Sequence, residues 1–391
     1  MDNKTIYLDY AATTPVKPEV LAEMLPYYNE KFGNPSSLYS KGQETKNALN
    51  IAREKVASII GATPKEIFFT SSGTEADNWA VIEGARWKKD KGNHIITSQI
   101  EHHAVLYSAK YLEKQGFDVT YLPVNEEGLV NPKDLEDAIR EDTILVSIML
   151  ANNEIGTIQP IAELAAIAHA KGILFHTDAV QALGNIKVDV GELGVDMMSI
   201  SGHKIYAPKG VGALYIKKGI RLPAMLHGGA QESNRRASTE NVAGIVAFGK
   251  ATELAKDNLD EYASKLTSLR DYFLAQVKDR IPDIRINGSL ENRLPGNVNI
   301  TFKYIEGEAI MLLMDMKGIL VSTGSACSSA SLSPSHVLDA IGVPVEEIHG
   351  SIRFSFGDFT TKEDVDATLD ILEETIVKLR NISPVSEKAG F

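Results

Sequence analysis

The chain has 391 residues, 43% of them hydrophobic and 24% charged, and because one core rarely grows beyond ~250–300 residues we expect two domains. The net charge of −12 argues against non-specific binding to DNA or RNA, which requires a basic surface. Every apolar stretch is shorter than the ~20 residues of a membrane span, and the start of the chain lacks a secretory signal, so we expect a cytoplasmic protein without membrane attachment.

Helix-like and strand-like segments alternate over the first two thirds of the sequence. Helical periodicity marks residues 17–32, 43–60, 74–89, 104–115, 131–139, 161–171 and 242–279. Short β-branched runs predict strands at residues 66–70, 94–98, 118–122, 143–150, 173–177, 197–201 and 212–216. This alternation predicts an α/β fold with a largely parallel central sheet.

The pattern changes after the long helical segment that ends near residue 279. Short strands are predicted at residues 284–286, 297–302, 319–322 and 351–356, with helices at 306–317, 333–341 and 362–381 between them. We interpret this region as a smaller α+β domain, with a boundary near residues 250–265.

An acid and a lysine each follow a predicted strand. Asp178 comes closely after an apolar run, and Lys204 follows the next one. Ligand chemistry gathers at strand ends in open α/β sheets. A pyridoxal phosphate (PLP) enzyme needs these two groups, a lysine that holds the cofactor covalently and a carboxylate that keeps its ring nitrogen protonated. Taken singly, each residue is more often an ordinary strand-end Asp or a solvated Lys.

A small-residue turn around Gly73 joins a predicted strand to a helix. Gly73 allows close approach of the backbone, so the turn and Thr74 can hold a phosphate. The turn matches neither a Walker A loop nor a dinucleotide fingerprint, and a plain helix cap explains its hydroxyl side chains about as well.

Other polar residues follow neighbouring strands. His102 can stack on a planar cofactor and carry protons, or it can simply cap a helix. A metal site made by His102, His103, His176 and Asp178 lacks the usual ligand spacing. Asn152 and Asn153 are turn formers or ligand-binding amides, and Gln181 should reach the same rim as Asp178.

Cys327 is the only cysteine, which excludes an intrachain disulfide and a cysteine-based metal cage. It lies in a run of small residues at the end of a strand, where a loop suits a mobile nucleophile, although an inert buried thiol is the alternative. Arg353 projects from an apolar strand and needs an anionic partner. Either a substrate carboxylate or a structural salt bridge satisfies that need.

Together these residues resemble a cysteine desulfurase, a member of the class V aminotransferase group of PLP fold-type I enzymes. The resemblance covers nearly the whole chain, from residues 8–15 to 353–357, and a long segment after Cys327 is similar to the subgroup with a long cysteine loop. The specific blocks are Gly33-Asn34-Pro35-Ser36-Ser37, Asn152-Asn153-Glu154-Ile155-Gly156, Ser201-Gly202-His203-Lys204 and Gly324-Ser325-Ala326-Cys327.

The resemblance implies a large PLP-binding domain over residues 15–255 and a small domain, formed by 1–14 and 256–391, that carries the cysteine loop. It implies that one group of residues binds the cofactor: Gly73, Thr74, His102, Asn153, Asp178, Gln181, Ser201, His203, Lys204 and, from the other subunit of a homodimer, Thr239. It further implies that Asn34, Asn153 and Arg353 bind the substrate. Ala207 and Ser238 stand where the family often has Gly, which makes the Thr239 contact the least secure.

The activity implied is removal of sulfur from L-cysteine, with Cys327, Lys204 and His102 as the catalytic residues. The products would be L-alanine and a Cys327 persulfide, whose sulfur passes to an acceptor protein for iron–sulfur cluster, thio-tRNA or thio-cofactor synthesis. No metal is expected beyond a cluster held transiently by Cys327. Alternatives are an aminotransferase, a selenocysteine lyase, a non-catalytic scaffold for iron–sulfur assembly, and a metal hydrolase.

Overall fold

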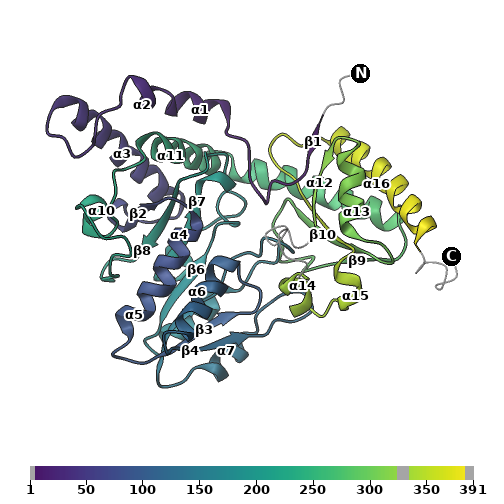
Figure 1. The fold of residues 1–391 in the computed structure, drawn as a ribbon, viewed down its shortest axis with the longest axis horizontal. Coiled ribbons are helices and arrows are strands. Elements are labelled where there is room, and N and C mark those ends of the chain that lie inside the picture. Colours follow the sequence, from purple (N-terminus) through teal and green to yellow (C-terminus); the bar gives the residue numbers. More distant parts are fainter. Residues whose placement is uncertain (1–4, 324–333, 384–391) are drawn as a thin grey trace.

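The computed structural model describes residues 5–323 and 334–383, and its largest feature is a seven-stranded sheet (Figure 1). The strands lie in the order β2-β8-β7-β6-β5-β3-β4. Only β8 runs antiparallel to its neighbours, so the other six share one direction. The strands are β2 (Ile67–Thr70), β3 (His94–Ser98), β4 (Asp118–Leu122), β5 (Thr143–Ser147), β6 (Leu174–Asp178), β7 (Met197–Ser201) and β8 (Gly212–Ile216).

Helices cover both faces of this sheet because successive strand residues point to opposite sides. Phe69 and Ile96 face the cluster that contains α3 (Ser40–Ile59), α8 (Ile161–His169) and α11 (Val242–Asp257). Their neighbours Phe68 and Ile95 face the cluster formed with α4 (Gly73–Asn78), α5 (Gly84–Lys88) and α6 (His103–Glu113). Shorter helices complete this part of the chain: α1 (Pro18–Met24), α2 (Pro26–Asn29), α7 (Pro132–Ala138), α9 (Val190–Leu193) and α10 (Gln231–Asn234).

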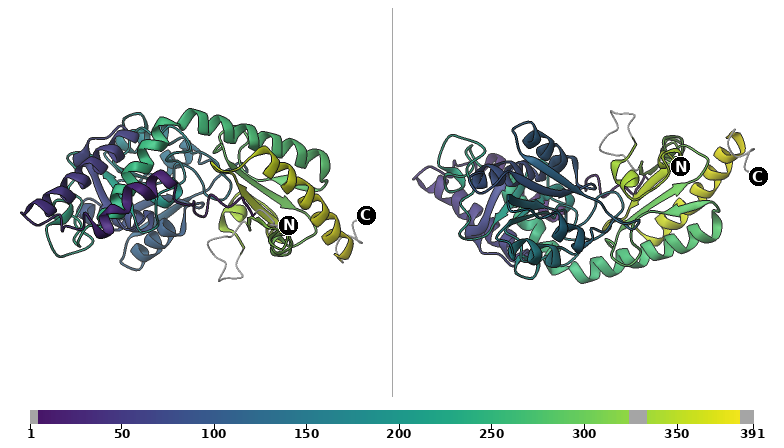
Figure 2. Two further views of the ribbon diagram at one scale, coloured as in Figure 1. Left: turned by 90° about the horizontal axis from the view of Figure 1, so that it is seen from above. Right: turned by 90° about the horizontal axis from the view of Figure 1, so that it is seen from below.

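A second, antiparallel sheet has the order β12-β13-β10-β9, with strands β9 (Ile284–Ile286), β10 (Asn297–Phe302), β12 (Ser322–Thr323) and β13 (Ser351–Ser355). Its core is a separate hydrophobic cluster that includes Phe273, Phe302 and Phe354. The helices of this part are α12 (Leu259–Arg280), α13 (Gly307–Asp315), α14 (His336–Ala340), α15 (Val345–Ile348) and α16 (Lys362–Ile382). Figure 2 shows α12 running along one side of the molecule. The division near residue 255 remains a prediction.

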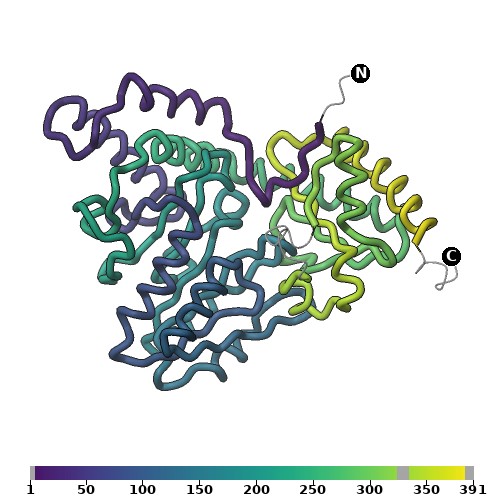
Figure 3. The backbone as a smooth tube through the Cα atoms, viewed as in Figure 1, coloured from purple at the N-terminus to yellow at the C-terminus, as the bar shows by residue number. Residues whose placement is uncertain are grey.

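The start of the described chain belongs with the second sheet. Strand β1 (Ile6–Tyr7) pairs in parallel with β11 (Ile319–Leu320), and Leu8 is part of the same core as Phe354. The backbone then crosses to the large sheet, as the purple tube in Figure 3 shows. Residues 9–14 therefore lie between the two parts.

Three predicted helices are interrupted. Residues 17–32 form α1 and α2, because Pro26 lacks the N–H that a continuous helix needs. Residues 74–89 contain a π-helical turn, η2 (Trp79–Glu83), between α4 and α5. Asn258 separates α11 from α12, so the prediction of a single helix over residues 242–279 was wrong. No helix among the described residues is both long and apolar enough to traverse a bilayer.

Candidate active site

The ends of several parallel strands place the predicted residues along one edge of the large sheet. Strand β6 ends at Asp178, and its neighbour β7 ends at Ser201, directly before the 3-10 turn η3 (Gly202–Lys204). Strand β2 ends at Thr70, and the chain then turns through Gly73 into α4. The strand order therefore brings an acid, a lysine and a small-residue turn to the same place.

These residues line one cavity of about 350 Å³. Its wall contains ten of the predicted site residues: Gly73, Thr74, His102, Asn153, Asp178, Gln181, Ser201, His203, Lys204 and Arg353. Residues that were not predicted complete the wall: Ala11, Ala12, Ser72, Asp77, Met149 and Val180. The cavity thus gathers residues from the start, middle and end of the sequence.

Asp178 and Lys204 provide the charged groups at the sheet edge. Asp178 is buried, and its Oδ1 accepts a 2.8 Å hydrogen bond from the Val180 N–H. Burial raises the pKa of Asp178 to about 6, although this hydrogen bond and the charge of Lys204 oppose the shift. The Lys204 Nζ donates to the carbonyl oxygens of Ala11 and Ala12, at 2.5 and 2.7 Å.

The turn that precedes α4 is shaped for a group that approaches the backbone closely. A Cβ added at Gly73 would lie 2.6 Å from Val180 Cγ2, so no larger residue fits without movement. The Ser201 hydroxyl in the same wall is buried and has no hydrogen-bond partner within the described residues. A phosphate would satisfy this hydroxyl and the free N–H groups of the turn, so these residues fit the phosphate of PLP.

His102 both caps a helix and faces the cavity. Its Nδ1 accepts a 3.1 Å hydrogen bond from the Ala104 N–H, which leaves the proton on Nε2. Burial, assisted by the positive charge of Lys204, lowers the pKa of His102 to about 4. The two interpretations of this residue are therefore compatible, and its ring is neutral near pH 7.

Arg353 is only 2% exposed and contacts two other parts of the chain. Its Nη2 forms a 2.8 Å ion pair with Asp9 Oδ1, and its Nη1 donates to the Asn153 carbonyl at 3.0 Å. Its Nε is buried without a hydrogen-bond partner among the residues described. Arg353 thus has a structural salt bridge and also retains donors for a carboxylate in the cavity.

Three predicted site residues are not part of this cavity wall. Asn34 is exposed, and its side-chain oxygen accepts a hydrogen bond from the Ser36 N–H. Thr239 is also exposed, and the preceding Ser238 has a φ of 109°, a conformation that favours glycine. Cys327 lies outside the described residues. Within the described part of the chain, no group of three or more His, Cys, Asp or Glu side chains could hold a metal ion.

Sequence reasoning missed Asp9, Asp77 and the backbone of Ala11 and Ala12. Asp77 lies one helical turn after Gly73, a spacing that would have placed it near the phosphate turn. Nothing in the sequence indicated that residues 9–12 contact strand ends nearly 200 residues away.

An α/β fold in which a buried strand-end acid and a lysine share one cavity is typical of PLP-dependent enzymes. The chain matches the family model described as Aminotransferase class-V over residues 6–368, and it belongs to that family.

Curated relatives and solved structures agree with this membership. The chain is 58% identical over 385 residues to "Cysteine desulfurase IscS" of Dictyoglomus turgidum, with 98% of each chain covered. It is 56% identical to the protein of the same name from Methanosarcina thermophila, covering 99% of this chain and 96% of that one. A solved structure titled "NIFS-LIKE PROTEIN" is 41% identical, with a TM-score of 0.91 over 96% of this chain and 100% of its own. Another, "SspA in complex with cysteine", is 37% identical, with a TM-score of 0.81 over 91% of this chain and 100% of its own.

Proposed function

We propose that this protein is a PLP-dependent cysteine desulfurase that removes sulfur from L-cysteine. The observation that carries this proposal is the cavity in which Lys204, Asp178 and Arg353 meet. The near full-length identity to curated cysteine desulfurases supports the same activity. The product would be L-alanine, with the sulfur retained on Cys327.

Each part of the cavity wall suits one part of the cofactor. Gly73, Thr74, Ser201 and His203 would hold the phosphate, joined by Thr239 from the other subunit of a homodimer. Asp178 would pair with the ring nitrogen, and His102 would stack on the ring. Gln181 and Asn153 would face the ring hydroxyl. When bound, PLP supplies an electron-withdrawing ring that makes the Cα proton of an attached amino acid acidic.

The protein side chains would bind the substrate and move its protons. Arg353, with Asn34 and Asn153, would hold the carboxylate of L-cysteine by charge-assisted hydrogen bonds. The Lys204 amine would take the proton from the substrate Cα, and the Nε2 proton of His102 is available for later transfers. Because burial and Lys204 keep the pKa of His102 near 4, its ring places no further positive charge beside the lysine.

Cys327 would receive the sulfur. Its thiolate would attack the substrate sulfur, so that an S–S bond forms while the C–S bond breaks. The electron pair of the broken bond stays with the organic fragment, which leaves as L-alanine after protonation. We further propose that a protein acceptor in the cytoplasm takes the persulfide sulfur for iron–sulfur cluster, thio-tRNA or thio-cofactor synthesis.

The test supplies the purified full chain with PLP and L-cysteine but without a keto acid. We expect alanine, and sulfide once a reductant is added. Lys204→Ala should abolish both products, whereas Lys209→Ala, at an exposed lysine nearby, should retain them. Alanine that forms only when a keto acid is present would indicate an aminotransferase and contradict the proposal. Turnover of selenocysteine alone would indicate a selenocysteine lyase.

A further inference from the structure

A second buried acid, Asp77, lies in the wall of the cofactor cavity. The residue is 1% exposed, and its Oδ1 has no hydrogen-bond partner among the described residues. Asp77 belongs to α4, the helix that starts at Gly73. An unpaired buried carboxylate is costly, so its charge state needs an explanation.

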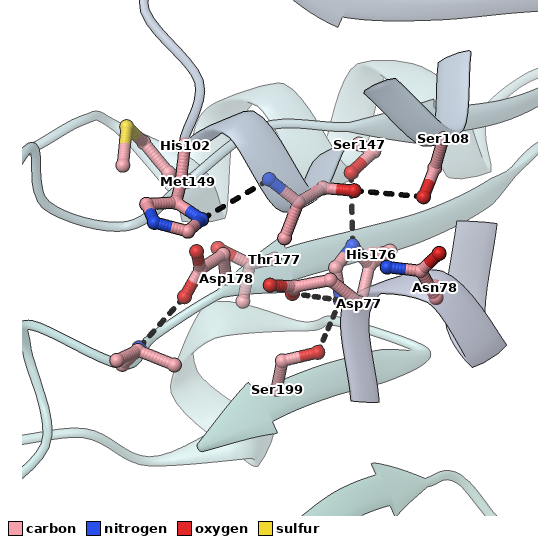
Figure 4. A network of polar contacts seen from close by, with 12 residues as sticks. Asp77, Asn78, His102, Ser108, Ser147, Met149, His176, Thr177, Asp178 and Ser199 are labelled. Atoms are coloured by element: carbon pink, nitrogen blue, oxygen red, sulfur yellow. Dashed lines mark hydrogen bonds and ion pairs between the residues drawn. The ribbon is translucent and has the colours of Figure 1, made fainter. Parts of the chain in front are cut away.

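The nearest groups form a polar network that contains no positive charge (Figure 4). Asp77 Oδ1 lies 3.8 Å from Nε2 of His176, and the nearby Ser199 hydroxyl favours the ionised form of the Asp77 carboxyl, against the effect of burial on its pKa. The two ring nitrogens of His176 lie 2.9 Å from the hydroxyls of Ser147 and Ser199. Complete burial lowers the pKa of His176 to about 3, so its ring is neutral. His176 therefore does not neutralise an ionised Asp77.

Two other acidic side chains, Asp178 and Glu101, affect the pKa of Asp77. Burial, and then the negative charge of Asp178 on β6, raise the pKa of Asp77 well above its usual range. Glu101, which precedes α6, acts in the same direction only when it is ionised, and its own burial raises its pKa to about 8. The basic side chains of the cavity, on Lys204, His203 and Arg353, line its wall together with Asp178. Two close carboxyl groups in a buried site do not both ionise readily.

We propose that Asp77 is a positioning residue that supports Asp178 and the Ser199–His176 network as a neutral carboxylic acid, leaving Asp178 as the single negative charge of the pair. A protonated carboxyl fills the polar space in this wall and keeps a hydrogen bond without adding a second charge. The wall would then present one negative charge to the ring nitrogen of PLP. This inference rests on the proposed cofactor site.

The test compares Asp77→Asn, which keeps the shape and stays neutral, with Asp77→Leu, which removes the polar group. Asp77→Leu should weaken PLP binding by about tenfold, as loss of a supporting partner commonly does, and shift the visible absorbance of the holoenzyme. Asp77→Asn should restore both properties to wild-type values. The matched control is Asp196→Asn, because Asp196 is a buried acid just before β7, at the opposite end of the sheet, where it pairs with His169.

An infrared difference spectrum gives a second readout on the cofactor-free protein. The wild-type spectrum minus the Asp77→Asn spectrum should show the C=O band of a protonated carboxyl group near pH 7. This measurement does not depend on whether the Leu variant folds. A carboxylate band in its place, or PLP binding weakened as much by Asn as by Leu, would overturn the proposal. A folded Leu variant with unchanged binding and absorbance would overturn it as well. Failure of the wild type itself to bind PLP would instead reject the proposed function.

Discussion

Asp9 and Arg353 are 344 positions apart in the sequence, yet their side chains form a 2.8 Å ion pair beside the cavity. Backbone pairing explains how they meet, because the Ser355 N–H donates to the Leu8 carbonyl and Asp9 forms a bridge with Ser355. The start of the chain thus holds the guanidinium of β13 in one orientation.

Asp9→Asn should weaken the binding of L-cysteine more than it slows catalysis. Arg353 would lose its carboxylate partner, and hydrogen bonds to charged groups are worth about 1.5–3 kcal/mol. We therefore expect the KM for cysteine to rise about tenfold or more, with a small change in kcat. Steady-state kinetics would check this, with Asp271→Asn as the control, because Asp271 is the exposed partner of an ion pair with Arg270. A fall in kcat at constant KM would contradict the assignment.

Gly73→Ala should reduce the affinity for PLP. The new methyl group would lie 2.6 Å from Val180 Cγ2, and Val180 also donates its N–H to Asp178. Overpacking of this kind costs about 1–3 kcal/mol, so the Kd measured by absorbance titration should rise about fivefold or more. Gly84→Ala is the control, since its methyl group would meet neighbours no closer than 3.4 Å. Equal affinities in both variants would refute a tight turn at Gly73.

Glu101→Gln should change how stability depends on pH. Complete burial raises the pKa of Glu101 to about 8, against the hydrogen bonds from Ser98 and the Met149 N–H. An unfolded glutamate titrates near ~4.3, so the folded wild type binds the extra proton and loses stability as pH rises from about 4 to 8. The variant lacks this loss. Urea unfolding at pH 5 and pH 8 should show a smaller decrease in the free energy of unfolding for Glu101→Gln than for wild type, and an equal decrease would argue against a protonated Glu101.

Cys327→Ser should separate cofactor binding from sulfur transfer. The variant should bind PLP and L-cysteine with unchanged spectra, because Cys327 is assigned no role in binding either molecule. It should release almost no sulfide, since a serine hydroxyl is a poor nucleophile toward sulfur. Quantifying sulfide and alanine checks the expectation, and substantial sulfide from the variant would remove Cys327 from the proposed mechanism.

The predicted α/β fold and the predicted family are confirmed, and the reason lies in strong local patterns. Consecutive apolar residues, such as Phe68 and Phe69 on opposite faces of β2, are typical of a strand that is buried on both faces. Helix interruptions depend on single residues. Pro26 was a visible signal that the periodicity overrode, whereas Asn258, which lies between α11 and α12 with φ −114° and ψ 12°, interrupts a segment whose periodicity continues past it.

The cavity was predictable where its residues follow strands in sequence, as Asp178 and Lys204 do. Asp9 could not be placed, because its position depends on pairing across the whole chain. Asp77 was missed, although its spacing of one helical turn from Gly73 indicated a position near the phosphate turn. Asn34 and Thr239 lie outside the cavity wall, so their roles remain proposals, and the proposed role of Thr239 requires a second subunit.

The pairing of β1 with β11, and of Leu8 with Ser355, has a consequence for biosynthesis. A ribosome releases the first residues long before the last strand, so the opening segment must wait, unpaired, until nearly the entire polypeptide has been translated. The Asp9–Arg353 pair proposed to hold the substrate carboxylate therefore forms late, after β13 has been translated. Translation products that lack β13 should bind no cysteine.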